Sequence, residues 1–275
     1  MQRQEQVEYL IERLLDEMPE YRLAAGEVNA ANRRALLRAL MNIRPPRAVD
    51  ESFLTVQDTL LSAERDEKGI VSLRDLRGDE AISSDVAPVQ ERPAPGSPEL
   101  LLWQGDITRL AVDGIVNAAN SKLLGCFAPN HRCIDNAIHS AAGVQLREEC
   151  ARIMSAQGHD EATGDAKITA GYNLPASYVL HTVGPIVNGS LTDTHREQLT
   201  ACYRSCLHLA LDHELSSIAF CCISTGEFHF PHQEAAQIAV ETVRNVLAQA
   251  GSTITVVFNV FKEEDRALYS QFLQR

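Results

Sequence analysis

The chain has 275 residues, of which 45% are hydrophobic, so a packed core is expected and global disorder is excluded. Its 37 acidic and 25 basic residues give a formal net charge of −12, which argues against a nucleic-acid partner but leaves a small phosphate-bearing ligand open. No apolar run approaches the ~20 residues of a membrane helix, and the polar N-terminus lacks a signal-peptide core, so we expect a cytoplasmic protein without a membrane partner.

The first third of the chain carries three amphipathic helical patterns. They cover residues 2–18, residues 36–41 and residues 53–61, and the second stops before Pro45. The composition then changes to that of a semi-rigid linker with Pro88, Pro93, Pro95, Gly96, Ser97 and Pro98. We therefore expect a small helical extension over residues 1–87, a Pro-rich linker over residues 88–98 and a second domain over residues 99–275.

After the linker, short apolar runs alternate with helical patterns. The runs that we interpret as strands cover residues 100–103, 114–116, 166–170, 178–182, 217–222 and 254–258. The helical patterns cover residues 135–156, 194–213, 232–249 and 263–273. This alternation predicts an α/β layer sandwich around a parallel or mixed sheet. Because ligands bind such sheets in the crevice at the carboxyl ends of the strands, we expect the site there.

Two segments that follow predicted strands have the chemistry of nucleotide binding. Asp106 is suited to accept a hydrogen bond from an adenine amino group or a ribose hydroxyl, although an aspartate here also favours a turn. The second segment offers hydroxyls, a glycine and main-chain N–H groups, which would cradle a pyrophosphate without any basic residue. An ordinary strand-to-helix turn is the alternative for these residues, which are Ser224, Thr225, Gly226, Glu227 and Phe228.

A third segment has the side chains of a metal site. Cys126, His131 and Cys133 are soft ligands of the kind that zinc prefers, and three protein ligands leave a coordination position for water or substrate. The remaining cysteines lie in apolar surroundings, where we expect them to behave as small hydrophobic residues of the core. These are Cys150, Cys202, Cys206, Cys221 and Cys222.

Spacing alone leaves three alternatives open for this segment. The three residues could be unrelated loop residues, because short Cys/His motifs also match by chance. A fourth ligand from Asp135, His139 or Cys150 would close the shell and make the site structural. Cys133 could also be a nucleophile with His131 as its base, but neighbours in sequence rarely have that geometry.

Five motifs occur in the order in which macrodomains carry them. They are residues 105–108 (Gly-Asp-Ile-Thr), 112–120 (Val-Asp-Gly-Ile-Val-Asn-Ala-Ala-Asn), 135–143 (Asp-Asn-Ala-Ile-His-Ser-Ala-Ala-Gly), 181–185 (His-Thr-Val-Gly-Pro) and 224–226 (Ser-Thr-Gly). From about residue 99 to the C-terminus, the chain therefore resembles the macrodomain family. The resemblance implies a three-layer α/β/α fold with a mixed central sheet that binds ADP-ribose, and many members hydrolyse ADP-ribose from modified proteins.

The chain departs from the usual hydrolytic macrodomain pattern at one place. A glycine-rich run normally precedes the helix aspartate, but residues 125–133 are Gly-Cys-Phe-Ala-Pro-Asn-His-Arg-Cys. This resembles the zinc-containing branch of microbial macrodomain hydrolases, whose members also carry a helical N-terminal extension. The resemblance thus implies one Zn²⁺ per chain, with Cys126, His131 and Cys133 as its ligands.

The resemblance also implies a role for each residue of the ligand site. Asp106 would hold the adenine amino group, Ile107 would contact the adenine or the pyrophosphate by its backbone, and Asn120 would bind the distal ribose. Asn259 and Phe261 would border the adenine. The remaining ADP-ribose contacts would come from Cys133, Ile134, Asp135, Ser224, Thr225, Gly226, Glu227 and Phe228.

The function that follows is a zinc-dependent hydrolase that removes mono-ADP-ribose from acidic side chains of a target protein. Asn120 and Asp135 would be its catalytic residues, because Asp135 matches the aspartate that activates water or ribose in related hydrolases. Its partner would be a mono-ADP-ribosylated protein and its product ADP-ribose. The alternatives are a module that binds ADP-ribose without cleaving it and a deacetylase of O-acetyl-ADP-ribose.

Overall fold

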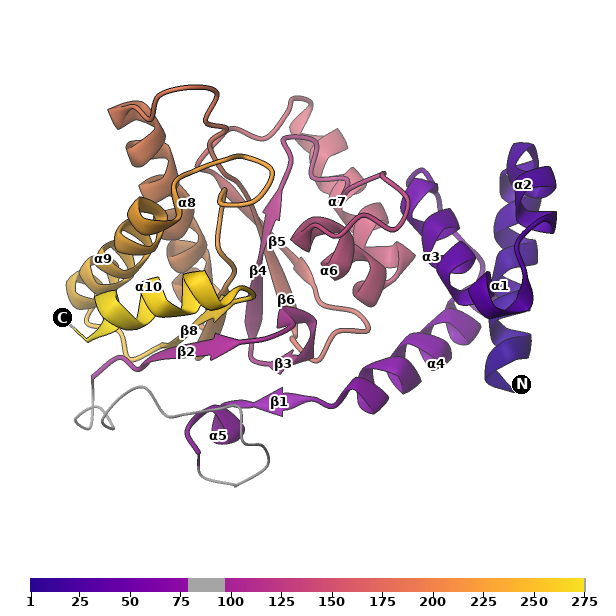
Figure 1. Ribbon diagram of the computed structural model, residues 1–275, viewed down its shortest axis with the longest axis horizontal. Helices are drawn as coiled ribbons and strands as arrows, with labels where there is room; N and C mark the ends of the chain where they lie inside the picture. The colour runs from indigo at the N-terminus through magenta and orange to yellow at the C-terminus, as the bar shows by residue number, and fades with distance from the viewer. Residues whose placement is uncertain (79–96, 275) are drawn as a thin grey trace.

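A mixed six-stranded sheet forms the centre of the protein in a computed structural model that describes residues 1–78 and 97–274 (Figure 1). The strands are β2 (Leu100–Gln104), β4 (Gly114–Ala119), β5 (Ala166–Ala170), β6 (Tyr178–Val183), β7 (Ser217–Phe220) and β8 (Thr255–Val260). Their order in the sheet is β2-β8-β7-β4-β6-β5. Strand β5 runs antiparallel to β6, and the other pairings are parallel.

Helices cover both faces of the sheet and make the three-layer α/β/α sandwich that the alternation predicted. On one face, α6 (Ile134–Ala142) packs against β4 and α7 (Val144–Gln157) packs against β5. On the other side lie α8 (Asp193–Asp212), α9 (His232–Ala250) and α10 (Glu263–Leu273) (Figure 1). In the described parts of the chain, no helix is both long enough and apolar enough to cross a membrane.

The strands and helices predicted after the linker all occur, with ends that differ by at most three residues from the predicted ones, and one predicted helix is divided in two. Residues 135–156 were predicted as a single helix, but Gly143, with φ +99°, separates α6 from α7. The N–H of Val144, at the start of the new helix, donates a hydrogen bond to Gln57 Oε1 at 3.0 Å. Because the hydrophobic spacing continues across the glycine, the periodicity did not reveal the break.

The N-terminal region folds around an apolar core of its own. The predicted helices are confirmed as α1 (Arg3–Glu17), α3 (Arg33–Ile43) and α4 (Glu51–Lys68), which contribute most of this core. Shorter elements that the sequence did not predict are α2 (Arg22–Gly26), β1 (Val71–Ser72), α5 (Leu73–Leu76) and the 3₁₀ turns Pro19–Tyr21 and Ala30–Asn32. Residues 79–96, which include most of the predicted linker, lie outside the described residues, so the domain boundary stays a prediction.

The helical extension lies directly against the sheet domain. Helices α3 and α4 both contact α6, and β1 pairs in parallel with the short strand β3 (Leu110–Ala111). Val144, at the start of α7, is buried in the apolar core of the extension. The extension therefore supports α6, the helix that carries Asp135 and follows residues 124–133, which we call the Cys/His loop.

Candidate functional site

The two predicted catalytic residues lie together at the carboxyl end of β4. Asn117, which is fully buried within β4, donates from Nδ2 to Asp135 Oδ1 at 2.8 Å. Asn120, one residue beyond the strand, donates from Nδ2 to Asp135 Oδ2 at 3.4 Å and to the Gly125 carbonyl at 3.2 Å. The strand thus presents two amides to one carboxylate, and both oxygens of that carboxylate are oriented.

Asp135 is an unusual carboxylate because its side chain is almost entirely removed from solvent. Burial raises the pKa of Asp135 to about 6, against the opposing effects of the Asn117 hydrogen bond and the Arg147 charge. His139 Nε2 lies 3.5 Å from Asp135 Oδ1, and burial lowers the pKa of His139 well below its usual value, so the imidazole is neutral. A carboxylate whose pKa approaches neutrality is suited to exchange a proton with a bound substrate or water.

The Cys/His loop brings its three predicted metal ligands together. Cys126, His131 and Cys133 each offer one ligand atom, and these atoms lie within 4.8 Å of one another. Cys126 Sγ and His131 Nδ1 are 3.6 Å apart. Among the residues that the structure describes, neither Asp135 nor Cys150 belongs to this group, so the group offers three ligands rather than four. Two sulfurs and an imidazole form a donor set that suits zinc.

Cys133 has a second role as the N-cap of α6. Its Sγ accepts a hydrogen bond from the Asn136 N–H at 3.4 Å, so the sulfur faces the positive end of the helix dipole. Burial raises the pKa of the Cys133 thiol to about 12. A metal ion would reverse this preference, because a coordinating thiol is deprotonated.

The loop after β7 faces the Cys/His loop. Glu227 Oε1 lies 3.9 Å from His131 Nε2, which joins the predicted pyrophosphate cradle to the predicted metal ligands. Ser224 is buried with φ +64°, and among residues 1–78 and 97–274 no hydrogen-bond partner reaches its hydroxyl. The Phe230 N–H closes the turn on the Ser224 carbonyl at 2.9 Å. The exposed tip, at Gly226 and Glu227, is free to approach a ligand.

Asp106 has the turn-forming role that the sequence left open, and its role as a ligand-binding residue stays a prediction. Its Oδ1 accepts hydrogen bonds from the N–H and the hydroxyl of Thr108, which makes it the cap of a 3₁₀ turn (Ile107–Arg109). Its Oδ2 is 3.9 Å from Lys68 Nζ, and the side chain as a whole is 40% exposed. Ile107 is buried, which leaves its backbone as the part able to face the crevice.

The two residues at the end of β8 that were expected beside the adenine differ in their exposure to solvent. Asn259 is buried, and its Nδ2 donates to the Gly105 carbonyl at 3.0 Å, so the amide holds neighbouring strand ends together. Phe261 is 79% exposed and offers an aromatic face at the same edge. Only Phe261 is therefore available to a ligand.

The residues that sequence reasoning did not include in the site are mainly buried polar groups. Asn136 donates from Nδ2 to the Ala128 carbonyl at 3.0 Å and so ties the Cys/His loop to α6. Cys150, Cys202, Cys206 and Cys221 are buried in the core as predicted, and Cys222 is partly buried. Cys150 also lies with His139 and His181 in a separate buried group. Only the position of Asn136, next to the motif aspartate, could have indicated its role.

A three-layer sandwich with its polar crevice at the carboxyl ends of parallel strands defines the class of α/β ligand-binding domains. The Macro domain model matches residues 116–239. A protein-ADP-ribose hydrolase of Treponema medium is 50% identical over 96% of this chain and 97% of its own length. A protein-ADP-ribose hydrolase of Staphylococcus aureus is 47% identical over 87% of this chain and 84% of its own length.

Solved structures agree with these sequence matches. A macrodomain mutant of Oceanobacillus iheyensis with ADPR is 40% identical, with a TM-score of 0.59 over 64% of this chain and 91% of the other. A Trypanosoma brucei macrodomain in complex with ADP-ribose is 30% identical, with a TM-score of 0.61 over 90% of this chain and 97% of the other. The chain belongs to the macrodomain family.

Proposed function

We propose that this protein is a zinc-dependent hydrolase that removes mono-ADP-ribose from acidic side chains of a target protein. The observation that carries the proposal is the convergence of three groups at one edge of the sheet. The buried carboxylate of Asp135 lies beside Asn120, and the group formed by Cys126, His131 and Cys133 lies next to it in sequence and space. Relatives named protein-ADP-ribose hydrolase, at 50% and 47% identity over most of the chain, support the activity.

ADP-ribose would lie across the carboxyl edge with its adenine near Asp106 and Phe261. Asp106 Oδ2 would accept from the adenine amino group, and the exposed ring of Phe261 would cover the base. The main-chain N–H groups of residues 224–228 would hold the pyrophosphate, which explains how a chain of net charge −12 binds a dianion. The distal ribose would then reach Asn120 and Asp135 in a single orientation.

The donor set of the Cys/His loop fits a zinc ion held by Cys126, His131 and Cys133. Such an ion, when bound, acts as a Lewis acid that lowers the pKa of a coordinated oxygen. The protein residues orient the reacting groups. Asn120 directs the ribose, while Asp135 takes a proton from the attacking water or from a ribose hydroxyl. A buried carboxylate is a stronger base than an exposed one because its charged form lacks solvation.

We also propose a cytoplasmic location. All seven cysteines are free, which fits a compartment that keeps thiols reduced. The Cys/His loop depends on the same condition, because oxidation of Cys126 or Cys133 would remove a zinc ligand.

A time course of ADP-ribose release tests the proposed function. The substrate is a protein mono-ADP-ribosylated on Asp or Glu, and the enzyme is compared as purified, after chelation and after zinc is returned. Release should be lost on chelation and restored by zinc. The Cys133→Ala variant should lose zinc and turnover but keep most of its ADP-ribose affinity.

Each other outcome points to a different function. Tight ADP-ribose binding without release from the zinc-loaded protein would indicate a binding module. Release of acetate from O-acetyl-ADP-ribose, without action on the modified protein, would indicate the deacetylase. Full turnover by metal-free Cys133→Ala would refute the role of zinc.

A further inference from the structure

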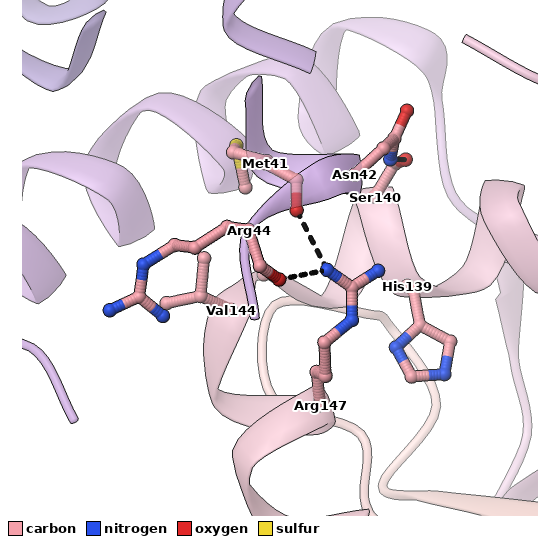
Figure 2. Close-up of a pocket in the computed structure, with 8 residues that line it drawn as sticks. Met41, Asn42, Arg44, His139, Ser140, Val144 and Arg147 are labelled. Carbon is pink, nitrogen blue, oxygen red and sulfur yellow. Dashed lines mark hydrogen bonds between the residues drawn. The ribbon is translucent and has the colours of Figure 1, made fainter. Parts of the chain in front are cut away.

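The C-terminal end of α3, in the helical extension, meets the Cys/His loop of the sheet domain. Figure 2 shows the Arg147 guanidinium, which comes from α7, turned toward the main-chain carbonyls of Met41 and Arg44. Arg147 Nη1 donates to these carbonyls at 3.0 and 2.6 Å. The last carbonyls of a helix lack partners within the helix and carry the negative end of its dipole, so a buried cation is well placed there.

The same arginine holds the first part of the Cys/His loop. Its Nε donates to the Leu124 carbonyl at 2.7 Å, and its guanidinium carbon lies 4.3 Å from the centre of the Phe127 ring. These two residues flank Gly125 and Cys126. Burial lowers the pKa of Arg147 to about 10, so the side chain remains charged at neutral pH. Arg147 thus connects the end of α3 to the segment that carries the first metal ligand.

Side chains of α3 hold the second part of the loop. Asn42 Oδ1 accepts a hydrogen bond from the Asn130 N–H at 3.0 Å, and Asn42 Nδ2 donates to Ser140 Oγ at 2.9 Å. Asn130 has φ +53°, a conformation that asparagine tolerates better than most residues but that still needs support. Arg38 Nη2 donates to the His131 carbonyl at 3.4 Å.

We propose that α3 of the extension is the template that holds Cys126, His131 and Cys133 in a metal-binding arrangement, with Asn42, Arg38 and Arg147 as positioning residues. The inference rests on the proposed zinc-dependent function. It assigns the extension a role in the reaction, although none of residues 1–78 supplies a side chain to the ligand group. A loop of this length without regular structure would otherwise sample many conformations, and each ligand would have to be ordered when the metal binds.

The competing explanation is that these contacts only attach the extension to the sheet domain. The chain offers a matched control for this possibility in Gln57, on α4. Gln57 Oε1 accepts the Val144 N–H at 3.0 Å, which is the same kind of bond as that from Asn130 to Asn42. The side-chain amide of Gln57 also donates to Asp58 and Gln145, so its hydrogen bonds hold residues outside the Cys/His loop. Both amides are buried.

The experiment compares full-length wild-type protein with Asn42→Leu, Asn42→Asp and Gln57→Leu. Zinc affinity is measured by competition with a chromogenic chelator, ADP-ribose affinity on the metal-free protein, and Tm in the presence of chelator. Asn42→Leu should weaken zinc binding by about 10- to 100-fold, the usual effect of removing a group that orients a metal ligand. Asn42→Asp keeps the acceptor for Asn130 and should retain most of the zinc affinity. Gln57→Leu should lower Tm without changing the zinc affinity.

Equal zinc affinity in Asn42→Leu and wild type would overturn the inference, as would equal losses in Asn42→Leu and Gln57→Leu. If Asn42→Leu does not fold, Arg38→Met, at a partly exposed position, takes its place and is expected to weaken zinc binding in the same direction. Wild-type protein that binds no zinc would refute the zinc-dependent function itself, and that result is seen before any variant is compared.

Discussion

Replacing Gly184 with alanine should displace the predicted pyrophosphate loop. A Cβ at Gly184 would lie 2.0 Å from Ser224 Oγ and 2.9 Å from Ile223 Cγ2, and both distances are shorter than those between non-bonded atoms in proteins. Ser224 is buried, so its hydroxyl has little space into which it can rotate away from the added methyl group. The segment that follows, residues 224–228, must therefore shift.

The size of the effect follows from the cost of overpacking. Inserting a methyl group into a filled site costs about 1–3 kcal/mol, and the unfolding free energy should fall by that amount. If ADP-ribose binds only the undisplaced loop, the same free energy weakens binding by roughly 5- to 150-fold. Ser224→Gly removes the closer of the two conflicting atoms and suits a positive φ, while the contact with Ile223 Cγ2 remains, so the double variant with Gly184→Ala should recover part of both losses.

The wild-type protein, the two single variants and the double variant form a double-mutant cycle. ADP-ribose affinity is measured by calorimetric titration, and the free energy of unfolding is measured in urea. The coupling between the two positions should be favourable and larger than about 1 kcal/mol. Wild-type affinity and stability in Gly184→Ala would refute the steric argument. An additive cycle, in which Ser224→Gly gives no recovery, would show that the loss arises elsewhere.

Three further predictions concern the buried groups and the rim of the site. Burial lowers the pKa of His181 from its ordinary value of 6.5 to about 3. Between pH 6.5 and pH 3, the unfolded chain therefore binds a proton at this histidine and the native chain does not, so the free energy of unfolding falls as the pH falls. In His181→Asn, the difference in unfolding free energy between pH 7 and pH 5 should be about 2 kcal/mol smaller than in the wild-type protein, as measured by urea unfolding in the presence of chelator. The same difference in both proteins would contradict this prediction. Asp135→Asn should lower kcat by about 10²- to 10⁴-fold with little change in ADP-ribose affinity, and near-normal single-turnover rates would exclude Asp135 as the base. Phe261→Ala should weaken ADP-ribose binding by about tenfold and leave the binding of ribose 5-phosphate, which has no adenine, unchanged. If the variant binds ADP-ribose with the wild-type affinity, the ring does not contact the adenine.

The order of secondary structure was predictable because it depends on neighbours along the chain. Burial alternates or repeats with a fixed period, so the patterns over residues 166–170 and 263–273 matched β5 and α10 residue for residue. The motif residues at the carboxyl ends of the strands were predictable for a related reason. A polar amide that directly follows a strand, such as Asn120, lies at the carboxyl end of the sheet whichever strands pair beside it.

Contacts between distant segments could not be predicted in this way. The strand order and the antiparallel β5 depend on which strands pair, and hydrophobic periodicity contains no partner information. The sequence around Asp106 is compatible with a turn cap and with a ligand-binding residue. Only the structure shows that Asp106 Oδ1 accepts hydrogen bonds from Thr108 while the side chain stays partly exposed.

The sequence by itself determined that this chain has a helical N-terminal region, an α/β sheet region and a cluster of Cys and His residues before a helix aspartate, because each follows from local composition and spacing. Only the tertiary structure decided that the extension supports that cluster. Asn42 and Arg147 look like ordinary helix residues in sequence, and they acquire their role through hydrogen bonds to Asn130 and Leu124 across the chain. Such bonds form where packing brings unpaired main-chain groups together, which no local pattern specifies.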